Sequence, residues 1–378
     1  MKIVMLLSNG FAPDPRVAAE AVALQEAGHQ VTIFAWDRLG EYPERDHYQG
    51  VHLIRSRLRT TYSRGPLQII PFFKFWRECR NFLKTGSVDV IHCHDLDTLW
   101  PGVAAGQRLG IPVLFDAHES YPDMVAHLFP EPVLGMVRRM EAALVPKTTA
   151  VITVGRILAG RFKKLRAARV VVVGNYKNIE GVPVEPASPV PLRLIYVGGL
   201  NRDRLLEPVI NAVSGDPRFQ LRVVGDGPER ERLRAIAGDS GNIAFSGFLP
   251  QEEARRLIGE SHLVYYGVDA RFPNNRYSAP NSLFLALAAG RPVITTPVGE
   301  IASIIQTENC GSVLPDLSTE TIRRTLERYL DQQSWRTEAA NAFRASQTVY
   351  NWETARRNLI GLYQELERNH GKTPIDSD

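Results

Sequence analysis

The chain has 378 residues, 44% of them hydrophobic, which allows two or three domains with substantial cores. Its formal net charge of +4 is too small by itself to indicate nucleic-acid binding. No stretch approaches the roughly 18 apolar residues of a membrane span, and the apolar N-terminal run is shorter than a signal peptide requires. The cysteines Cys79, Cys93 and Cys310 have no framework spacing, which favours a reducing cytoplasm.

The N-terminal segment predicts a strand, a helix and a second strand. Residues 3–7 and 31–35 are apolar runs, and residues 16–27 between them have helical apolar spacing with Gly28 as the C-terminal cap. Strands joined by a helix pair in parallel, so we expect a parallel sheet. The turn that ends at Gly10 follows the first strand, where such sheets receive ligands.

Residues 54–85 combine eight basic residues with one acid, and isoleucine, phenylalanine and tryptophan side chains are interleaved with them. A basic, aromatic helix of this kind can lie in an anionic membrane interface. The alternative is a domain helix whose aromatic side chains are in the core and whose arginines are solvated. The segment is therefore a candidate for peripheral contact with an anionic membrane.

Acidic and histidine residues follow the predicted strand at 88–93. Asp95 and Asp97 form an Asp-x-Asp pattern that could hold a divalent metal, but we interpret them as loop acids. His92 and His94 share one face of the strand by its period of two. Because the sequence places no further ligands nearby, we interpret both histidines as loop or core residues and predict no metal site.

The strand at 112–116 is followed by His118 and Glu119. The carboxyl ends of strands are where α/β sheets place their chemistry. An imidazole there could donate a hydrogen bond to developing oxyanion charge, so His118 is a candidate catalytic residue. The alternatives are a structural histidine with satisfied hydrogen bonds and, for Glu119, a helix cap.

A proline-rich segment at 176–191 predicts a linker, and the strand at 192–197 opens a second α/β domain. Gly198 and Gly199 then allow a close approach of backbone to phosphate. The arginines that follow, Arg202 and Arg204, can neutralise a pyrophosphate. The alternative for this turn is a solvated charged loop.

Residues 277–297 read as a loop, a buried helix, a tight turn and a short strand. Gly290 is placed as the C-terminal cap of the helix, and Pro292 prevents its continuation. In an open α/β sheet, the loop before such a helix directs backbone N–H groups and the positive dipole end toward a ligand.

This stretch resembles the donor site of the retaining GT-B glycosyltransferases of family 4, through the run Ala-Ala-Gly-Arg-Pro-Val-Ile at 288–294. The family places two glutamates, separated by seven residues, on this loop and helix; here the positions are Tyr277 and Leu285. A related subset reads Pro-Asn-Lys-Leu-Phe-Glu, whereas this chain has Ser282 and Leu285 in place of the lysine and glutamate. Leu285 cannot accept the hydrogen bond that the glutamate accepts from ribose hydroxyls.

The resemblance also assigns roles to residues elsewhere. It implies donor binding by the residues Gly198, Gly199, Arg202, Arg204, Phe248, Leu249, Tyr277, Asn281, Ser282 and Leu285. It implies an acceptor side formed by Gly10, Asp14, Arg16 and Glu119, where the alternative for Asp14 and Arg16 is helix capping and surface charge. It places His118 near the donor sugar and its leaving phosphate, and makes His118 and Arg204 the expected catalytic residues.

The resemblance implies two doubly wound Rossmann-like domains facing across a cleft. We expect an acceptor domain at 1–175, a linker at 176–191, a nucleotide-sugar domain at 192–348 and a helix at 349–370 that crosses back to the first domain. The terminal helix pattern ends before a frayed tail.

The expected function is transfer of a sugar, with retention, from a UDP- or GDP-sugar to a glycan or lipid-linked acceptor in the cytoplasm, at or near the inner face of the membrane. No metal and no cofactor besides the donor are expected, because arginines can supply the positive charge. The first alternative is a degenerate GT-B module that binds nucleotide, glycan or a partner transferase without turnover. The second is a nucleotide-sugar epimerase, whose acid and base the sequence does not place.

Overall fold

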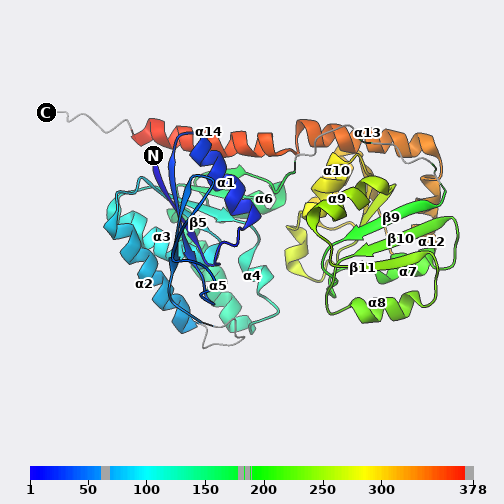
Figure 1. Cartoon of the computed structure of the whole chain (residues 1–378), viewed down its shortest axis with the longest axis horizontal. Coiled ribbons are helices and arrows are strands. Elements are labelled where there is room, and N and C mark those ends of the chain that lie inside the picture. The colour runs from blue at the N-terminus through cyan, green and yellow to red at the C-terminus, as the bar shows by residue number, and fades with distance from the viewer. Residues whose placement is uncertain (61–68, 178–182, 184–187, 189, 371–378) are drawn as a thin grey trace. The chain divides into compact units, whose positions relative to one another are not determined.

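The computed structural model describes residues 1–60, 69–177, 183, 188 and 190–370. Most of the predicted linker at 176–191 and residues 61–68 of the basic, aromatic segment lie outside this range. The chain divides into two compact units: Met1–Gly174 with Ala355–Asp378, and Asn175–Thr354. Each unit is an α/β structure around one sheet (Figure 1).

The first unit alternates strands and helices, as its apolar pattern predicts. Its elements are β1 (Lys2–Leu7), α1 (Pro15–Glu26), β2 (Gln30–Trp36), β3 (Arg45–Tyr48), β4 (Val51–Ser56), α2 (Ile69–Thr85), β5 (Val90–His94), α3 (Leu96–Leu109), β6 (Val113–Ala117), α4 (Tyr121–Met124), α5 (Glu131–Leu144), η2 (Val145–Lys147), β7 (Ala150–Thr153), α6 (Arg156–Lys164) and β8 (Val170–Val172). Among the described residues they form one sheet in the order β3-β4-β2-β1-β5-β6-β7-β8, parallel except for β3 against β4.

The sheet is parallel where the sequence has near-continuous apolar runs. All five residues of β5 and of β6 are buried, as expected for strands covered by helices on both faces. The edge strand β3 was not predicted, because Arg45–Tyr48 is polar and alternates between intermediate and exposed positions. Its pairing with β4 depends on a tight turn with left-handed backbone at Gln49 and Gly50.

The last helix, α14 (Trp352–His370), belongs from Ala355 onward to the first unit. Figure 1 shows it in red beside α1, and Arg356 on α14 forms an ion pair with Glu26 on α1. Asn358 donates to the backbone oxygen of Val172, and the hydroxyl of Tyr363 lies 2.9 Å from Nδ1 of His92. The C-terminal helix therefore reaches the interior of the first unit.

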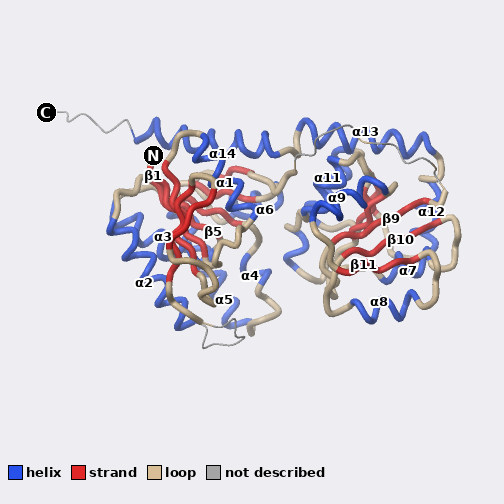
Figure 2. The backbone as a smooth tube through the Cα atoms, in the orientation of Figure 1, coloured by secondary structure: helices blue, strands red, loops and turns tan. Residues whose placement is uncertain are grey.

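The second unit repeats the parallel α/β pattern. Its elements are β9 (Leu192–Val197), α7 (Glu207–Val213), β10 (Phe219–Val224), α8 (Arg230–Ala237), β11 (Ile243–Gly247), α9 (Gln251–Glu260), β12 (Leu263–Tyr266), η3 (Pro273–Arg276), α10 (Asn281–Ala288), β13 (Val293–Thr295), α11 (Gly299–Glu308), β14 (Gly311–Val313), α12 (Thr319–Arg328) and α13 (Gln332–Thr348). The described strands form a parallel sheet in the order β11-β10-β9-β12-β13-β14, with helices on both sides (Figure 2).

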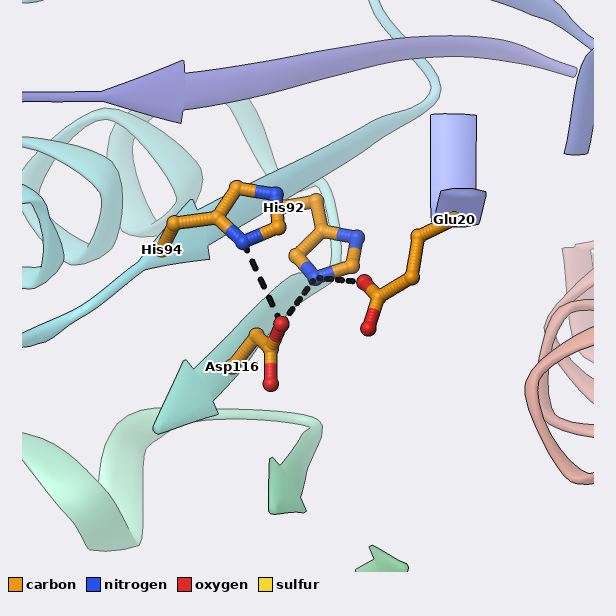
Figure 3. Close-up of side chains that lie close together, drawn as sticks. All are labelled: Glu20, His92, His94 and Asp116. Carbon is orange, nitrogen blue, oxygen red and sulfur yellow. Dashed lines mark ion pairs between the residues drawn. The ribbon is translucent and has the colours of Figure 1, made fainter. Parts of the chain in front are cut away.

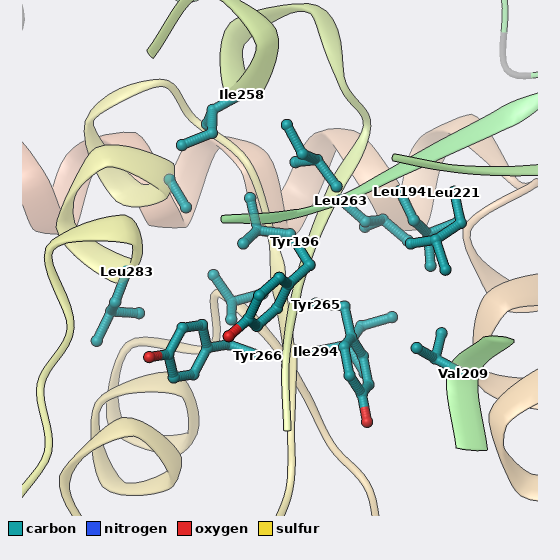
Figure 4. Close-up of a cluster of buried hydrophobic side chains, with 14 of the residues drawn as sticks. Leu194, Tyr196, Val209, Leu221, Ile258, Leu263, Tyr265, Tyr266, Leu283 and Ile294 are labelled. Atoms are coloured by element: carbon teal, nitrogen blue, oxygen red, sulfur yellow. The ribbon is translucent and has the colours of Figure 1, made fainter. Parts of the chain in front are cut away.

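The core of the second unit is apolar and includes the predicted buried helix. Leu194, Tyr265 and Ile294 from neighbouring strands pack in one cluster with Leu283 on α10 (Figure 4). The helix ends as predicted: Gly290 has a left-handed backbone (φ 64°), its N–H donates to Leu287, and the next N–H donates to Ala286. This double capping bond closes the turn before β13.

The basic, aromatic segment is helical only from residue 69, since residues 51–56 are β4. On α2, the side chains of Phe75, Cys79 and Leu83 are buried, whereas Ile70 and Phe73 are about half exposed. The helix therefore combines the two alternatives considered for this segment: one apolar stripe lies in the core, as in a domain helix, and two apolar side chains remain at the surface, where a membrane could bury them. Among the described residues, no helix is long and apolar enough to cross a membrane.

Candidate active site

Charged side chains from three elements meet at the carboxyl edge of the first sheet. Arg16 and Glu20 lie one turn apart on α1, His92 and His94 point to one face of β5, and Asp116 is the fourth residue of β6 (Figure 3). All except Arg16 are fully buried, and the Arg16 side chain is only 9% exposed. β5 and β6 are neighbours in the sheet, with His94 paired to Asp116, which brings these side chains together.

Asp116 is the centre of the cluster. Its Oδ1 accepts from Nη2 of Arg16 at 2.7 Å, and its Oδ2 accepts from Nε of Arg16 at 3.1 Å. The same Oδ2 lies 3.0 Å from Nε2 of His118 and 3.2 Å from Nδ1 of His94. Arg16 is anchored in turn by the backbone oxygen of Val173 at 2.7 Å. A two-pronged guanidinium–carboxylate pair of this kind is rigid and directional.

The two buried carboxyl groups have opposite protonation tendencies. Burial raises the pKa of Glu20 to about 8, with Arg16 opposing and Asp116 adding to the rise. Burial also acts to raise the pKa of Asp116, but Arg16 and His118 outweigh it and hold that pKa well below its usual range. Near neutral pH, Asp116 is therefore the ionised partner of Arg16, and Glu20 holds a proton.

His118 lies between two carboxylates. Its Nε2 faces Asp116 as described, and its Nδ1 is 3.5 Å from Oδ2 of Asp95. Burial alone would lower the pKa of His118, but Asp95 and Asp116 together raise it to about 9. The residue predicted to act at this strand end is therefore a cation at neutral pH.

His92 and His94 are buried, stacked rings with unsatisfied nitrogens. Their ring centroids are 4.5 Å apart, and His92 Nδ1 is bonded to Tyr363. Burial, with the neighbouring His94, lowers the pKa of His92 well below its usual value, so its ring is neutral. Among the described residues, Nε2 of both histidines and both carboxyl oxygens of Glu20 make no hydrogen bond, although Oε1 of Glu20 lies at ion-pair distance, 3.0 Å, from Nη2 of Arg16.

Four of these residues have the types and spacing of a metal-binding group. One ligand atom from each of Glu20, His92, His94 and Asp116 lies within 4.8 Å of the others. However, the ligand oxygen of Asp116 already faces three donors, and Arg16 places a permanent positive charge against both carboxyl groups, 3.0 Å from Glu20. A second cation there would be repelled by Arg16, so the donor set fits a proton better than a metal ion.

From the sequence, we expect core or loop histidines at 92 and 94 and no further ligands nearby. They are core residues, but the fold supplies Glu20 and Asp116 as neighbours. Glu20 was not recognised as a site residue. Its i,i+4 spacing from Arg16, on the same face as the buried Val17, was the available signal.

The predicted acceptor-side residues are distributed around this edge. Asp14 caps α1, since its carboxylate accepts from the backbone N–H groups of Arg16 and Val17. Gly10 lies in the turn after β1, where its backbone oxygen accepts from Nε of Arg55 at 2.8 Å. Glu119 is exposed after β6. Of the four, only Arg16 joins the buried cluster.

At the carboxyl edge of the second sheet, the glycine loop after β9 is held by tight backbone contacts. A Cβ at Gly225 would lie 1.8 Å from the oxygen of Gly198, and one at Gly227 would lie 2.5 Å from the oxygen of Leu200. Both Gly225 and Gly227 also have positive φ, so only glycine fits these positions. The loop carrying Gly198 and Gly199 is therefore fixed by backbone packing and by the Tyr196 hydroxyl, which donates to the backbone oxygen of Gly199 at 2.7 Å.

The two predicted phosphate-binding arginines differ in their surroundings. Arg204 is mostly buried, pairs with Asp203, donates to Asn275 at 3.0 Å, and lies 5.4 Å from the ring centroid of Tyr266. Arg202 is 86% exposed and contacts Glu229 at 3.4 Å. Arg204 is therefore held in place before any ligand binds, whereas Arg202 extends into solvent.

The other predicted donor-side residues fall into exposed and buried groups. Phe248, after β11, is 81% exposed, and Leu249 packs partly against the core. Asn281 begins α10 at an exposed position. Ser282 and Leu285 are buried, Leu285 as part of the apolar core, and Tyr277 is half-buried. These residues lie on loops and helix starts at the carboxyl edge of the second sheet, except that Leu285 lies in the second turn of α10.

Comparison with protein families finds the same division of the chain. The model of glycosyltransferase family 4 matches residues 16–179, and that of the glycosyl transferases group 1 matches residues 191–332. Together the two models cover most of the 378 residues. The two matches correspond to the two sheets described above.

Individual relatives are distant. The chain is 22% identical over 221 residues to a protein described as a colanic acid biosynthesis glycosyltransferase, WcaL of Escherichia coli, a match covering 55% of this chain and 54% of that protein. The chain thus spans about half the length of the first curated relatives it matches.

Solved structures match over the whole chain. Sucrose-phosphate synthase from Thermosynechococcus elongatus superposes with a TM-score of 0.76 at 18% identity, covering 98% of this chain and all of that one. The HepE protein of Anabaena, solved with UDP-glucose, gives a TM-score of 0.69 at 14% identity, covering 97% and 100%. These likenesses confirm the predicted fold class of two parallel-sheet Rossmann-like domains. The chain has the GT-B fold, and the two family models that together span both units place it in glycosyltransferase family 4, the glycosyl transferases group 1.

Proposed function

We propose that this glycosyltransferase moves a sugar from a nucleoside-diphosphate donor, a UDP- or GDP-sugar, to a glycan or lipid-linked acceptor with retention of anomeric configuration. The observation that carries the proposal is the edge of the second sheet, where the tightly packed Gly198–Gly199 loop lies beside Arg204. Backbone N–H groups and a guanidinium fork together suit a diphosphate. HepE, a structural neighbour, was solved with UDP-glucose.

In this proposal the leaving diphosphate is stabilised by charge already present on the protein. Arg204 is held by Asp203 and Asn275, so little reorganisation is needed when negative charge develops. Arg202 is free to swing toward a ligand because its contact with Glu229 is long and exposed.

A catalytically degenerate binding module remains the second candidate, and one observation favours it. Leu285 replaces the expected carboxylate and is buried among apolar neighbours, so it offers no acceptor to ribose hydroxyls. A weakened donor site, with a cost of about 1.5–3 kcal/mol for a lost charged hydrogen bond, follows from this replacement.

The deciding experiment has two stages. First, thermal shift is measured with UDP, GDP, TDP and their sugars, for the wild type, Arg204→Ala and Arg218→Ala. Arg218 is the matched control because it also pairs with a nearby acid, Asp216, but lies at the amino end of β10. We expect a shift with one nucleotide that Arg204→Ala abolishes and Arg218→Ala preserves. A shift that Arg204→Ala leaves unchanged would contradict the assigned phosphate site.

The second stage separates the two candidates. With the nucleotide identified, the matching sugar donor is incubated with glycan and lipid-linked acceptors, and the anomeric configuration of any product is read by NMR. Product with retained configuration supports the enzyme. Nucleotide binding without product from any acceptor supports the binding module.

We also propose peripheral membrane contact through residues 54–85, of which 61–68 lie outside the described residues. Its support is the stripe on α2 where Ile70 and Phe73 are exposed beside Lys74 and Arg77. Apolar side chains flanked by cations are suited to an anionic interface. A lipid-linked acceptor would be presented at such a surface.

A further inference from the structure

His118 has an unusual pair of neighbours. Its Nε2 is 3.0 Å from Oδ2 of Asp116, and its Nδ1 is 3.5 Å from Oδ2 of Asp95. A neutral imidazole has one N–H and one lone pair, so it cannot donate to two carboxylates at once. Nε2 makes a hydrogen bond to Asp116 and also lies 3.3 Å from Nδ1 of His94, whereas Asp95 lies at ion-pair distance from Nδ1. Because both ring nitrogens face a carboxylate, the geometry favours a doubly protonated ring.

The two carboxylates hold this ring with unequal strength. Asp116 is fully buried and fixed by the two hydrogen bonds from Arg16, so its contact with His118 is permanent. The Asp95 carboxylate is 35% exposed, and its contact with the ring is longer. Asp95 can therefore leave the ring at little cost, whereas Asp116 cannot.

The side chain of Asp95 contacts His118 and does not cap its own helix. It occupies the N-cap position of α3, where an aspartate commonly accepts from the first helical N–H groups, but its side chain makes no capping bond. Oδ1 instead accepts from the backbone N–H of His118 at 3.3 Å, and Oδ2 faces the ring. Its backbone N–H donates to the oxygen of Asp116 at 2.9 Å, which ties this loop to β6.

We propose that Asp116 and Asp95 are positioning residues that keep His118 as an imidazolium. Asp116 holds Nε2, and Asp95 faces Nδ1–H until an anionic oxygen of the substrate takes its place. This inference rests on the proposed glycosyl transfer. It adds to that function a preformed hydrogen-bond donor with a fixed direction and a full positive charge.

The groups packed around the ring support a single charge state. The surrounding groups are Arg16 and Glu20 of α1, His92 and His94 of β5, Asp116 of β6, and Asp95 of the loop after β5. Tyr363 of α14 is linked to the ring through His92. Arg16 neutralises Asp116, and the protonated Glu20 adds no charge. The remaining negative charge beside the ring is that of Asp95, which balances the imidazolium.

The test is an NMR titration of histidine-labelled protein, which needs no donor or acceptor. The ring signals of His118, assigned with His118→Gln, are followed against pH in the wild type, Asp95→Asn and Asp116→Asn. We expect the wild-type midpoint to lie above the value of about 6.5 for an ordinary histidine, and each variant to lower it by about one pH unit or more. Asp239→Asn, at an exposed position of the second unit, should leave it unchanged.

Asp116→Asn leaves Arg16 without its charge partner and can fail to fold, so Asp95→Asn, at the exposed rim, is the decisive variant. A midpoint for His118 that Asp95→Asn does not move would overturn the proposal. So would a stoichiometric divalent metal in the purified wild type that is lost in Glu20→Gln.

Activity separates this inference from the proposed function. If transfer is observed, Asp95→Asn should shift the alkaline limit of the kcat/KM profile to lower pH and leave the KM of the acceptor within twofold. A raised KM of the acceptor with an unchanged pH profile would show that Asp95 contacts substrate instead. If no donor supports transfer, the proposed function fails, but the titration still decides the state of His118.

Discussion

At the carboxyl edge of the first sheet, the charged side chains are buried and paired with one another across long stretches of sequence. Arg16 and Asp116 are 100 residues apart in the chain. At the corresponding edge of the second sheet, Arg204 and Arg271 pair with acids close in sequence, Asp203 and Asp269, and Arg202 pairs with Glu229, 27 residues away. Arg202 and Arg271 are also largely exposed.

The difference shows how one fold can serve two purposes. Buried, mutually paired charges are fixed before a substrate arrives, so the first edge is suited to presenting one group, His118, in one protonation state. Exposed arginines can change partners, so the second edge is suited to closing on a phosphate. The following changes test this contrast and are ordered by decreasing effect.

Removing the central carboxylate of the first edge should have the largest effect. Asp116→Ala leaves the buried Arg16 without its charge partner, which costs about 3–5 kcal/mol of unfolding free energy. The measurement is urea denaturation at pH 7. The control is Arg202→Ala at the second edge, whose exposed ion pair should leave the midpoint unchanged. Similar losses in both variants would remove the contrast between the edges.

Removing the best-held arginine of the second edge should affect binding more than stability. Arg204→Ala deletes a guanidinium fork beside the glycine loop and should weaken binding of the preferred nucleoside diphosphate by about 10- to 100-fold. Isothermal titration with the nucleotide found in the thermal-shift screen measures this. Arg218→Ala should bind as the wild type does, and equal weakening in both would point to a general loss of positive charge.

The proton on Glu20 should appear in the pH dependence of stability. A carboxyl group whose pKa is raised from 4.5 to about 8 binds a proton in the folded state that the unfolded chain has released. Its contribution is complete below about pH 4.5 and is lost as pH rises toward 8, with a slope of at most about 1.4 kcal/mol per pH unit.

Glu20→Gln tests this slope because glutamine keeps the shape and a donor but cannot ionise. We expect the variant to lose less stability than the wild type between pH 5 and 8, measured by urea denaturation in a buffer series. Glu26→Gln, on the same helix but 60% exposed, is the matched control. Parallel curves for wild type and Glu20→Gln would mean that Glu20 is ionised and that another group compensates it.

The smallest effect is expected at the surface of α2. Phe73→Ala should reduce cosedimentation with anionic vesicles several-fold, because about half of its side chain is available for burial in the interface. Leu39→Ala, an equally exposed apolar side chain elsewhere in the first unit, should have no effect. Equal binding to neutral and anionic vesicles, or no binding, would remove membrane contact from the proposal.

Local pattern was sufficient for most of the fold. The alternation of apolar runs with helical spacing predicted the parallel sheets, and the Ala-Gly-Arg-Pro sequence after α10 predicted the cap at Gly290. These features depend on interactions within a few residues, which is why they can be read from the chain directly. The polar edge strand β3 escaped prediction because its pairing is decided by a neighbouring strand.

The composition of the first edge was decided by the tertiary structure. The sequence pointed to His118 as a candidate residue. Its partners Asp95 and Asp116 depend on which strands and helices are neighbours. So do the proton on Glu20 and the contact between His92 and Tyr363, which are 271 residues apart. A pKa depends on charges and burial in space, and the order of strands in a sheet is not the order of residues in the chain. Local sequence patterns therefore predict the fold class and the candidate residues, whereas the packing of strands and helices establishes which of those residues pair with one another.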